Sequence, residues 1–219
     1  MISKIDLHLH TTRYSPDSII SPEQLLLDAR EAGLTHVILT EHDAMWDAEE
    51  LAEINARPEA DGLKVFSGVE VSAREGHFLC FGLPDLRNVS PGIWLKDLIH
   101  EVKGHGGLIV AAHPFRWDQD FDSIFREFGS AFSALELASK NVDRTSRDRV
   151  ENLLSKHPAT LATGSSDAHE PGQIGCYYTE IPAQIQTMTD FLKALTSMPV
   201  KACHNSTGSV WQQSGPVGQ

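Results

Sequence analysis

The chain has 219 residues, of which 41% are hydrophobic and 22% are charged, a balance typical of a globular protein. Its formal net charge of −12 disfavours long-range attraction to nucleic acid or to an anionic membrane surface. No window approaches the roughly 20 apolar residues of a membrane span, and no apolar signal segment precedes the first predicted strand. Three cysteines, Cys80, Cys176 and Cys203, lack the paired spacing of a disulfide framework, so we expect a cytoplasmic protein.

Apolar runs alternate with amphipathic segments along most of the chain, which is the pattern of an α/β protein. The predicted strands lie around residues 2–10, 36–40, 65–71, 77–81, 108–112, 134–137, 160–163 and 176–181. The predicted helices lie around residues 22–33, 47–54, 91–104, 121–128, 150–154 and 188–195. Ser21 and Pro22 mark the start of the first helix, and Asp47 with Glu50 three residues later marks the start of the second.

Six or seven β–α units in a row predict a TIM-like (β/α) barrel smaller than the usual eight units. Helical crossovers between the strands predict that most of them run parallel. The loop 72–76 is short enough for a hairpin, so the strand that follows it is expected to run backwards. Chains of about 200–250 residues commonly form one such barrel, so we expect a single domain over residues 1–204. Residues 205–219, rich in Gly, Ser and Gln, are expected to form a C-terminal tail.

The stretch Asp6-Leu7-His8-Leu9-His10-Thr11 follows the first apolar run. Residues i and i+2 of a strand point to the same face, so His8 and His10 project together. Two neutral imidazoles side by side are good ligands for a divalent metal. A pair of half-exposed histidines near a terminus is an equally good interpretation of this motif alone.

Other strand ends carry the same residue types, and in (β/α) barrels the chemistry lies at the C-terminal ends of the strands. The nine candidate metal ligands are His8, His10, Asp17, His42, Glu70, His77, His113, Asp167 and His169. Asp17 is equally compatible with a turn after Ser15-Pro16, and His77 alone with a core histidine. His77 lies beside Glu70 only if the hairpin through residues 72–76 forms. We expect no site at the remaining histidines, His36, His100, His105, His157 and His204.

The combined motifs resemble one known family. They are Asp6-x-His8-x-His10, Thr40-Glu41-His42-Asp43, Gly68-Val69-Glu70, His77, His113-Pro114 and Ser166-Asp167-Ala168-His169. From residue 2 to about residue 180 the chain resembles the polymerase and histidinol phosphatase (PHP) superfamily of metal-dependent phosphoesterases. The resemblance implies a distorted (β/α)7 barrel with a trinuclear metal site.

By analogy with that family, one metal is held by His8, His10, Glu70 and Asp167. Glu70 bridges to a second metal, which also takes His77 and His113. The third metal is held by Asp17, His42 and His169. The mixed imidazole and carboxylate set suits zinc, manganese and iron alike.

The expected chemistry is hydrolysis of a phosphate ester. Three divalent cations contribute about +6 of charge and the carboxylates of Asp17, Glu70 and Asp167 about −3, so the cleft suits an anionic ester. A water bridging two metals can be hydroxide near pH 7, and we expect it to attack phosphorus in line. No Gly-x-Ser-x-Gly elbow surrounds Ser165-Ser166, so we reject a serine nucleophile. The expected substrate is a small phosphomonoester of nucleotide, sugar or histidinol type.

Several residues beside the ligands have expected roles. Arg116 is placed to bind a phosphate oxygen and assist catalysis. Asp6 and Asp43 are expected to orient imidazoles, with Asp43 also a candidate proton donor to the leaving group. The candidate substrate contacts are Arg116, Lys140 and Asn141. Glu136 ends a strand at the same rim, and the pattern does not decide whether it faces inward.

Two other functions stay open at this point. One is a phosphodiesterase or exonuclease that releases nucleotides from short oligonucleotides. The sequence has no basic stripe with interleaved aromatic residues, so no extended nucleic acid is expected as a partner, and no membrane. The other is a non-catalytic, metal-stabilised binding domain, which the complete ligand set disfavours.

Overall fold

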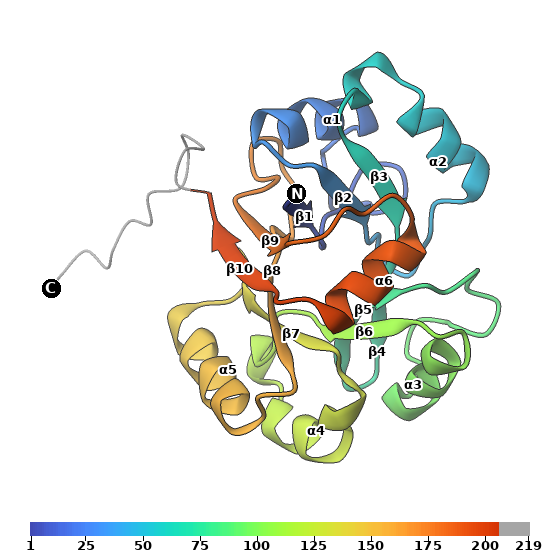
Figure 1. Cartoon of the computed structure of the whole chain (residues 1–219). Coiled ribbons are helices and arrows are strands. Elements are labelled where there is room, and N and C mark those ends of the chain that lie inside the picture. The colour runs from blue at the N-terminus through green and yellow to red at the C-terminus, as the bar shows by residue number, and fades with distance from the viewer. Residues whose placement is uncertain (206–219) are drawn as a thin grey trace, which may run out of the picture.

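The computed structural model describes residues 1–205, which form ten β-strands and six α-helices (Figure 1). The strands are β1 Ser3–Asp6, β2 His36–Leu39, β3 Lys64–Ser67, β4 Val69–Ala73, β5 Gly76–Phe81, β6 Leu108–Ala111, β7 Ala134–Ala138, β8 Leu161–Gly164, β9 Tyr177–Ile181 and β10 Lys201–His204. The helices are α1 Pro22–Glu31, α2 Ala48–Asn55, α3 Leu95–Gly104, α4 Phe121–Phe128, α5 Arg144–Lys156 and α6 Met188–Ser197. The predicted C-terminal tail lies outside the described residues, apart from Asn205. No helix in residues 1–205 is both long and apolar enough to cross a membrane.

The strands form two mixed sheets of five strands each, in the orders β10-β9-β1-β2-β3 and β4-β5-β6-β7-β8. The pairs β1–β2, β2–β3, β6–β7 and β7–β8 are parallel, and the other neighbouring pairs are antiparallel. The prediction of a TIM-like (β/α)7 barrel with mostly parallel strands is therefore wrong: the ladders do not close into one barrel. Helices α3 and α6 each link strands that pair antiparallel, so a helical connection in this protein does not always join parallel neighbours.

The break between the sheets occurs at Gly68, inside the single strand predicted for residues 65–71. A Cβ atom at Gly68 would lie 2.8 Å from the Phe81 ring and 2.9 Å from the Cys80 carbonyl oxygen. Glycine therefore lets the chain pass close to β5 as it leaves β3 in one sheet and enters β4 in the other. A continuous apolar run does not reveal such a change of sheet.

Local predictions were more successful than the global one. The hairpin is confirmed, since β4 and β5 pair antiparallel with Ser72 opposite His77. Ser21 caps α1 by accepting a hydrogen bond from the Gln24 N–H, and Asp47 and Glu50 form a capping box at α2. The third helix begins at Leu95, later than predicted, and β10 was not predicted at all.

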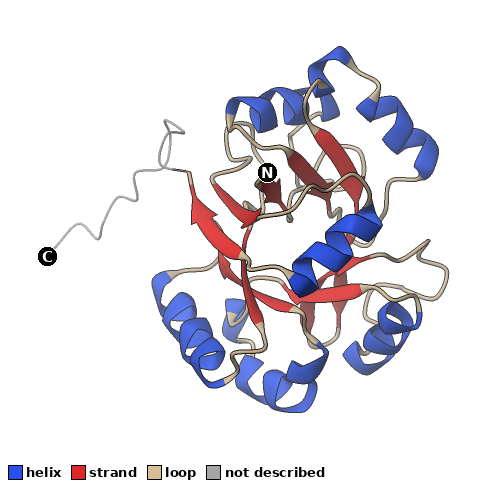
Figure 2. Cartoon of the chain, in the orientation of Figure 1, coloured by secondary structure: helices blue, strands red, loops and turns tan. Residues whose placement is uncertain are grey.

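The helices cover the outer faces of the two sheets. Helices α1 and α2 pack on the sheet that contains β2 and β3, and α3, α4 and α5 pack on the other sheet (Figures 1 and 2). A third apolar cluster lies between the sheets, where Leu79 and Val110 meet Phe191 of α6. Leu108 and Ala134, the first residues of β6 and β7, belong to the same cluster. Helix α6 thus covers the N-terminal ends of these strands and leaves the opposite ends to the polar residues.

At Gly164, the last residue of β8, the second sheet comes close to the β9–β10 pair of the first. The Thr179 hydroxyl donates to the Gly164 carbonyl (2.7 Å) and accepts from the Gly164 N–H (3.0 Å). A Cβ atom at Gly164 would lie 2.8 Å from the Tyr178 carbonyl oxygen and 3.2 Å from the Cys203 nitrogen. The absence of a side chain here allows the close approach.

Gly164→Ala is expected to lower the free energy of unfolding by about 1–3 kcal/mol, because backbone atoms must move to admit the methyl group. Urea denaturation followed by circular dichroism measures the change. Gly104→Ala is the matched control, since a Cβ atom there meets open space within a helix and is expected to be neutral or slightly stabilising. Equal stability of the two variants would contradict the close contact.

Candidate metal centre

The C-terminal ends of strands from both sheets meet at one place. Isolated parallel bridges join Leu9 to Ala168 and His42 to Glu70. The His10 N–H donates to the Ala168 carbonyl oxygen at 3.0 Å. Main-chain hydrogen bonds between the sheets therefore hold together residues that are distant in the sequence.

The deepest part of the site contains two imidazoles and two carboxylates, all buried. The Nε2 atoms of His8 and His10 each lie 3.3 Å from Glu70 Oε2 and 3.3 Å from Asp167 Oδ1. Yet within the described residues His8 Nε2, His10 Nε2 and Glu70 Oε2 have no hydrogen-bond partner. An unsatisfied buried polar atom costs roughly 1–3 kcal/mol, so three that face one another are unfavourable unless something binds between them. A divalent cation fits this donor set.

A second group of ligand atoms surrounds the other oxygen of Glu70. Glu70 Oε1 lies 2.9 Å from His77 Nδ1 and 3.1 Å from His113 Nε2. On the opposite side, Glu70 Oε2 also approaches His42 Nδ1 at 2.9 Å. The carboxylate thus faces separate sets of imidazoles with its two oxygens, which is the geometry of a bridging ligand.

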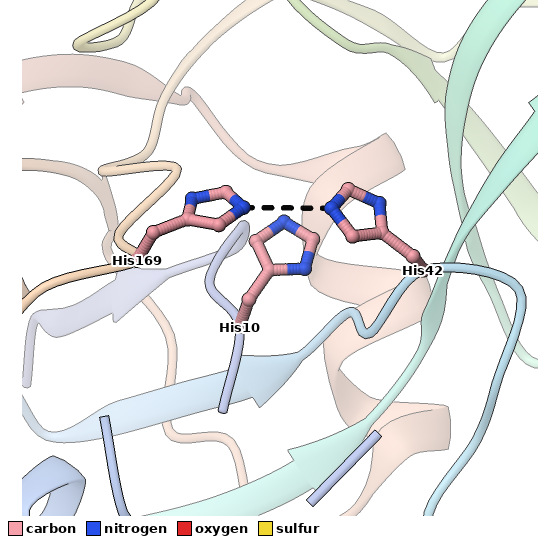
Figure 3. Close-up of side chains that lie close together, drawn as sticks. All are labelled: His10, His42 and His169. Atoms are coloured by element: carbon pink, nitrogen blue, oxygen red, sulfur yellow. Dashed lines mark hydrogen bonds between the residues drawn. The ribbon is translucent and has the colours of Figure 1, made fainter. Parts of the chain in front are cut away.

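A third group lies nearer the surface, where the rings of His10, His42 and His169 converge (Figure 3). His42 Nε2 and His169 Nε2 are 3.4 Å apart, and the His10 ring stacks on both, with centroids 4.1 and 4.3 Å away. Asp17 Oδ2 lies 3.2 Å from His42 Nε2 and 3.3 Å from His169 Nε2, although this side chain is 56% exposed. The structure thus brings all nine predicted ligands together, and it adds His10 to the group expected from Asp17, His42 and His169.

Glu136 faces inward and connects two of these histidines. Its Oε1 lies 3.1 Å from His8 Nδ1 and accepts a hydrogen bond from the Ser165 hydroxyl at 2.5 Å. Its Oε2 accepts from the His113 N–H at 2.7 Å. Glu136 therefore fixes the ring of His8 with Nε2 toward the centre and positions the backbone of His113.

Glu41 and Ser15 support His10 in the same way, and sequence reasoning gave neither a role. The Ser15 hydroxyl lies 3.1 Å from His10 Nδ1 and donates to Glu41 Oε2 at 2.6 Å. The buried Glu41 carboxylate also accepts from Trp46 Nε1 and from the Thr11 N–H, both at 3.0 Å. The signal for Glu41 was an acidic residue at the end of an apolar strand, because a carboxylate there needs several donors.

Asp6 and Asp43 differ in part from their expected roles. Asp6 accepts from the N–H groups of Ser166 and Gly175, both at 2.9 Å, and so fixes the backbone instead of an imidazole ring. Burial raises the pKa of the Asp6 carboxyl to about 6, although these hydrogen bonds lower it. Asp43 Oδ1 accepts from the Ser72 N–H at 2.8 Å and thereby joins β4 to the end of β2.

The three predicted substrate contacts lie at or near the cluster. Arg116 Nη1 is 3.7 Å from Asp167 Oδ2, and the Asn141 amide donates to the same oxygen. The Lys140 ammonium instead donates to Gln173 Oε1 at 2.6 Å. Arg116 and Asn141 thus reach Asp167, a member of the cluster. The Lys140 ammonium is bound to Gln173, which is not one of the proposed ligands.

The electrostatics of the centre favour positive charge. Burial raises the pKa of Glu70, but the surrounding imidazoles, His8 foremost, outweigh it and hold that pKa well below its ordinary value. Burial lowers the pKa of His10, but the carboxylates of Asp167 and Glu70 outweigh it and raise that pKa to about 9. A cavity that stabilises protons on buried imidazoles in this way can equally stabilise cations.

Glu136→Gln is expected to weaken metal binding by about 10–100-fold without removing a ligand, because the amide cannot accept all three hydrogen bonds. Calorimetric titration of Mn²⁺ into metal-free protein measures the affinity, and circular dichroism checks that the variant is folded. Glu151→Gln on the exposed face of α5 is the control. Unchanged affinity in a folded Glu136→Gln protein would contradict the supporting role.

A family model and a sequence relative match parts of this chain. A family model described as PHP-associated matches residues 151–198. The uncharacterized protein MJ1587 of Methanocaldococcus jannaschii is 30% identical over 122 residues, which cover 51% of this chain and 68% of that protein.

Solved structures share the fold. A two-domain protein from Bacteroides vulgatus containing a predicted PHP-like metal-dependent phosphoesterase has a TM-score of 0.73 and 22% identity; the match covers 94% of this chain and 65% of that one. This chain thus spans about two thirds of that protein. PsfC from Pseudomonas syringae has a TM-score of 0.70 and 19% identity, over 94% of this chain and 93% of that one. The lesion-specific endonuclease PfuEndoQ from Pyrococcus furiosus has a TM-score of 0.69 and 20% identity, over 90% and 56%. The chain belongs to the polymerase and histidinol phosphatase (PHP) superfamily, as its motifs predicted.

Proposed function

We propose that this protein is a metal-dependent phosphoesterase that hydrolyses a small phosphate monoester. The observation that carries the proposal is three buried atoms, His8 Nε2, His10 Nε2 and Glu70 Oε2, that have no hydrogen-bond partner within residues 1–205. The guanidinium of Arg116 lies near the same cluster, 3.7 Å from Asp167 Oδ2. A cation-binding cluster with a neighbouring arginine can bind an anionic ester inside a protein whose overall charge is negative.

The ligand atoms support up to three ions. The proposed ligands are His8, His10, Glu70 and Asp167 for one ion, Glu70, His77 and His113 for the second, and His42, His169 and Asp17 for the third, with His10 beside it. Bound divalent ions would polarise the phosphoryl oxygens and supply a nucleophile by lowering the pKa of water. Zinc, manganese and iron all fit this mixed donor set.

The protein's own residues would bind and orient the ester. The fork of N–H donors on Arg116 suits a phosphoryl oxygen, and its distance of 3.7 Å from Asp167 Oδ2 leaves it free to take that partner. Asp43 is the proposed proton donor to the leaving group. Its backbone N–H donates a hydrogen bond to the Glu70 carbonyl oxygen (2.9 Å), which holds Asp43 beside the cluster.

No protein nucleophile is proposed. The Ser165 hydroxyl is buried and donates to Glu136, and the buried Ser166 hydroxyl donates to the His8 carbonyl oxygen at 3.3 Å. Neither side chain is available for attack on phosphorus, which supports the rejection of a serine mechanism.

A monoester is favoured over a diester by size and charge. The pocket that borders the cluster at His77 and His113 has a volume of about 290 Å³, at the small end for ligand sites. The net charge of −12 does not suit a polynucleotide track. Cleavage of a diester, or metal binding without turnover, are the alternatives that the experiment distinguishes.

With added Mn²⁺ or Zn²⁺, the protein is expected to hydrolyse para-nitrophenyl phosphate faster than bis(para-nitrophenyl) phosphate, and a chelator should abolish both activities. His10→Ala is expected to reduce kcat by about 100-fold or more, because His10 belongs to two ligand groups. His100→Ala, an exposed histidine on α3, is the control and should keep full activity. Faster cleavage of the diester would support the phosphodiesterase, and metal binding without hydrolysis would support the binding domain.

A further inference from the structure

The pocket beside the cluster has an aromatic wall that the proposed chemistry does not use. It lies between the β4–β5 turn and residues 113–119, and its lining includes His77, His113, Arg116 and Trp117. Trp117 is 67% exposed. Single exposed apolar residues are common, so exposure alone indicates nothing.

The neighbours of Trp117 distinguish it from other exposed aromatic residues. Its ring centroid lies 5.2 Å from that of His77 and 5.6 Å from that of His113, with interplanar angles of 71° and 68°. The Arg116 guanidinium stacks over the indole at 4.1 Å from its centroid. Trp94 is also half exposed, but the cation that stacks on its ring is Arg74, which is not part of the metal cluster. Trp117 alone of these two lies against proposed metal ligands.

The backbone holds Trp117 in this position against its own preference. Phe115, Trp117 and Asp118 have φ angles of 71°, 54° and 56°, a left-handed conformation that bulky residues rarely adopt. Such conformations persist only where the surroundings impose them. Here Gln119 joins the segment to the hairpin, donating to the Glu75 carbonyl oxygen at 2.6 Å and accepting from the Phe115 N–H at 3.3 Å.

Gly76 makes this link possible. A Cβ atom at Gly76 would overlap the Gln119 amide, so only glycine leaves room for it. The segment is therefore pinned to the β4–β5 turn, and the indole stands at the edge of the cluster as a preformed surface. A preformed surface loses little entropy when it binds a flat partner.

We propose that Trp117 binds a planar aromatic ring on the alcohol part of the substrate, while Arg116 and the metal cluster bind its phosphate. The inference rests on the proposed phosphoesterase function and narrows its substrates to phosphate monoesters of nucleosides or of other aromatic alcohols. Stacking of a base or an aryl ring on an aromatic side chain needs no particular hydrogen bonds. A pocket of about 290 Å³ is large enough for one ring system.

Steady-state kinetics of the metal-loaded protein test the inference. The substrates are adenosine monophosphate, para-nitrophenyl phosphate and glycerol phosphate, which has no ring. Trp117→Ala is expected to lower the ratio of kcat/KM for the aromatic substrates over glycerol phosphate by about tenfold, mainly through KM. Trp117→Phe should restore part of the ratio, because it keeps a ring. Trp94→Ala is the matched control and should leave the ratio at its wild-type value.

The outcomes separate this inference from the function on which it rests. Hydrolysis with the same selectivity ratio in wild type and Trp117→Ala overturns the ring contact and leaves the phosphoesterase standing. A loss confined to one aromatic substrate supports the contact and identifies the ring as nucleoside or simple aryl. If the wild type hydrolyses none of the esters, the proposed function fails. Calorimetric binding of adenosine monophosphate then decides the contact: a Kd about tenfold weaker in Trp117→Ala supports it, and an equal Kd overturns it.

Discussion

The carboxylate of Glu70, buried among imidazoles from both sheets, is the interaction on which the arrangement depends. Its Oε2 faces His8, His10 and His42, and its Oε1 faces His77 and His113. A buried charge is tolerated only when it is compensated, so Glu70 requires these side chains or the cations they hold. The crossing at Gly68 puts Glu70 on β4, at the point where the chain enters the second sheet, and the bridge from His42 to Glu70 holds it beside the first sheet.

Much of the site was predictable from the sequence, because the C-terminal ends of parallel strands lie at the same edge of a sheet. This holds even when the exact first and last residues of each strand are not known. All nine candidate ligands come together on that basis, including His77, which depended on the hairpin. The supporting residues were harder to predict. Glu136 occupies a strand end without a motif to show which way it faces, and Ser15 reaches His10 only because a loop folds back.

The arrangement of the sheets was not predictable by the same reasoning. Periodicity identifies strands and helices but not the partner of each strand, and helices α3 and α6 connect strands that pair antiparallel. The continuous apolar run through Gly68 concealed the change of sheet. The left-handed segment around Trp117 was equally hidden, because bulky residues with positive φ follow no sequence rule and arise from contacts such as that of Gln119 with Glu75.

The most direct test of the account is anomalous X-ray diffraction from crystals grown with Mn²⁺ or Zn²⁺. If Glu70 lies between two metal ions, a strong peak is expected at the point shared by His8 Nε2, His10 Nε2 and Glu70 Oε2, and a second on the other side of Glu70, between His77 and His113. If crystals grown in the presence of the metal show no peak within bonding distance of Glu70, the proposed metal centre is contradicted.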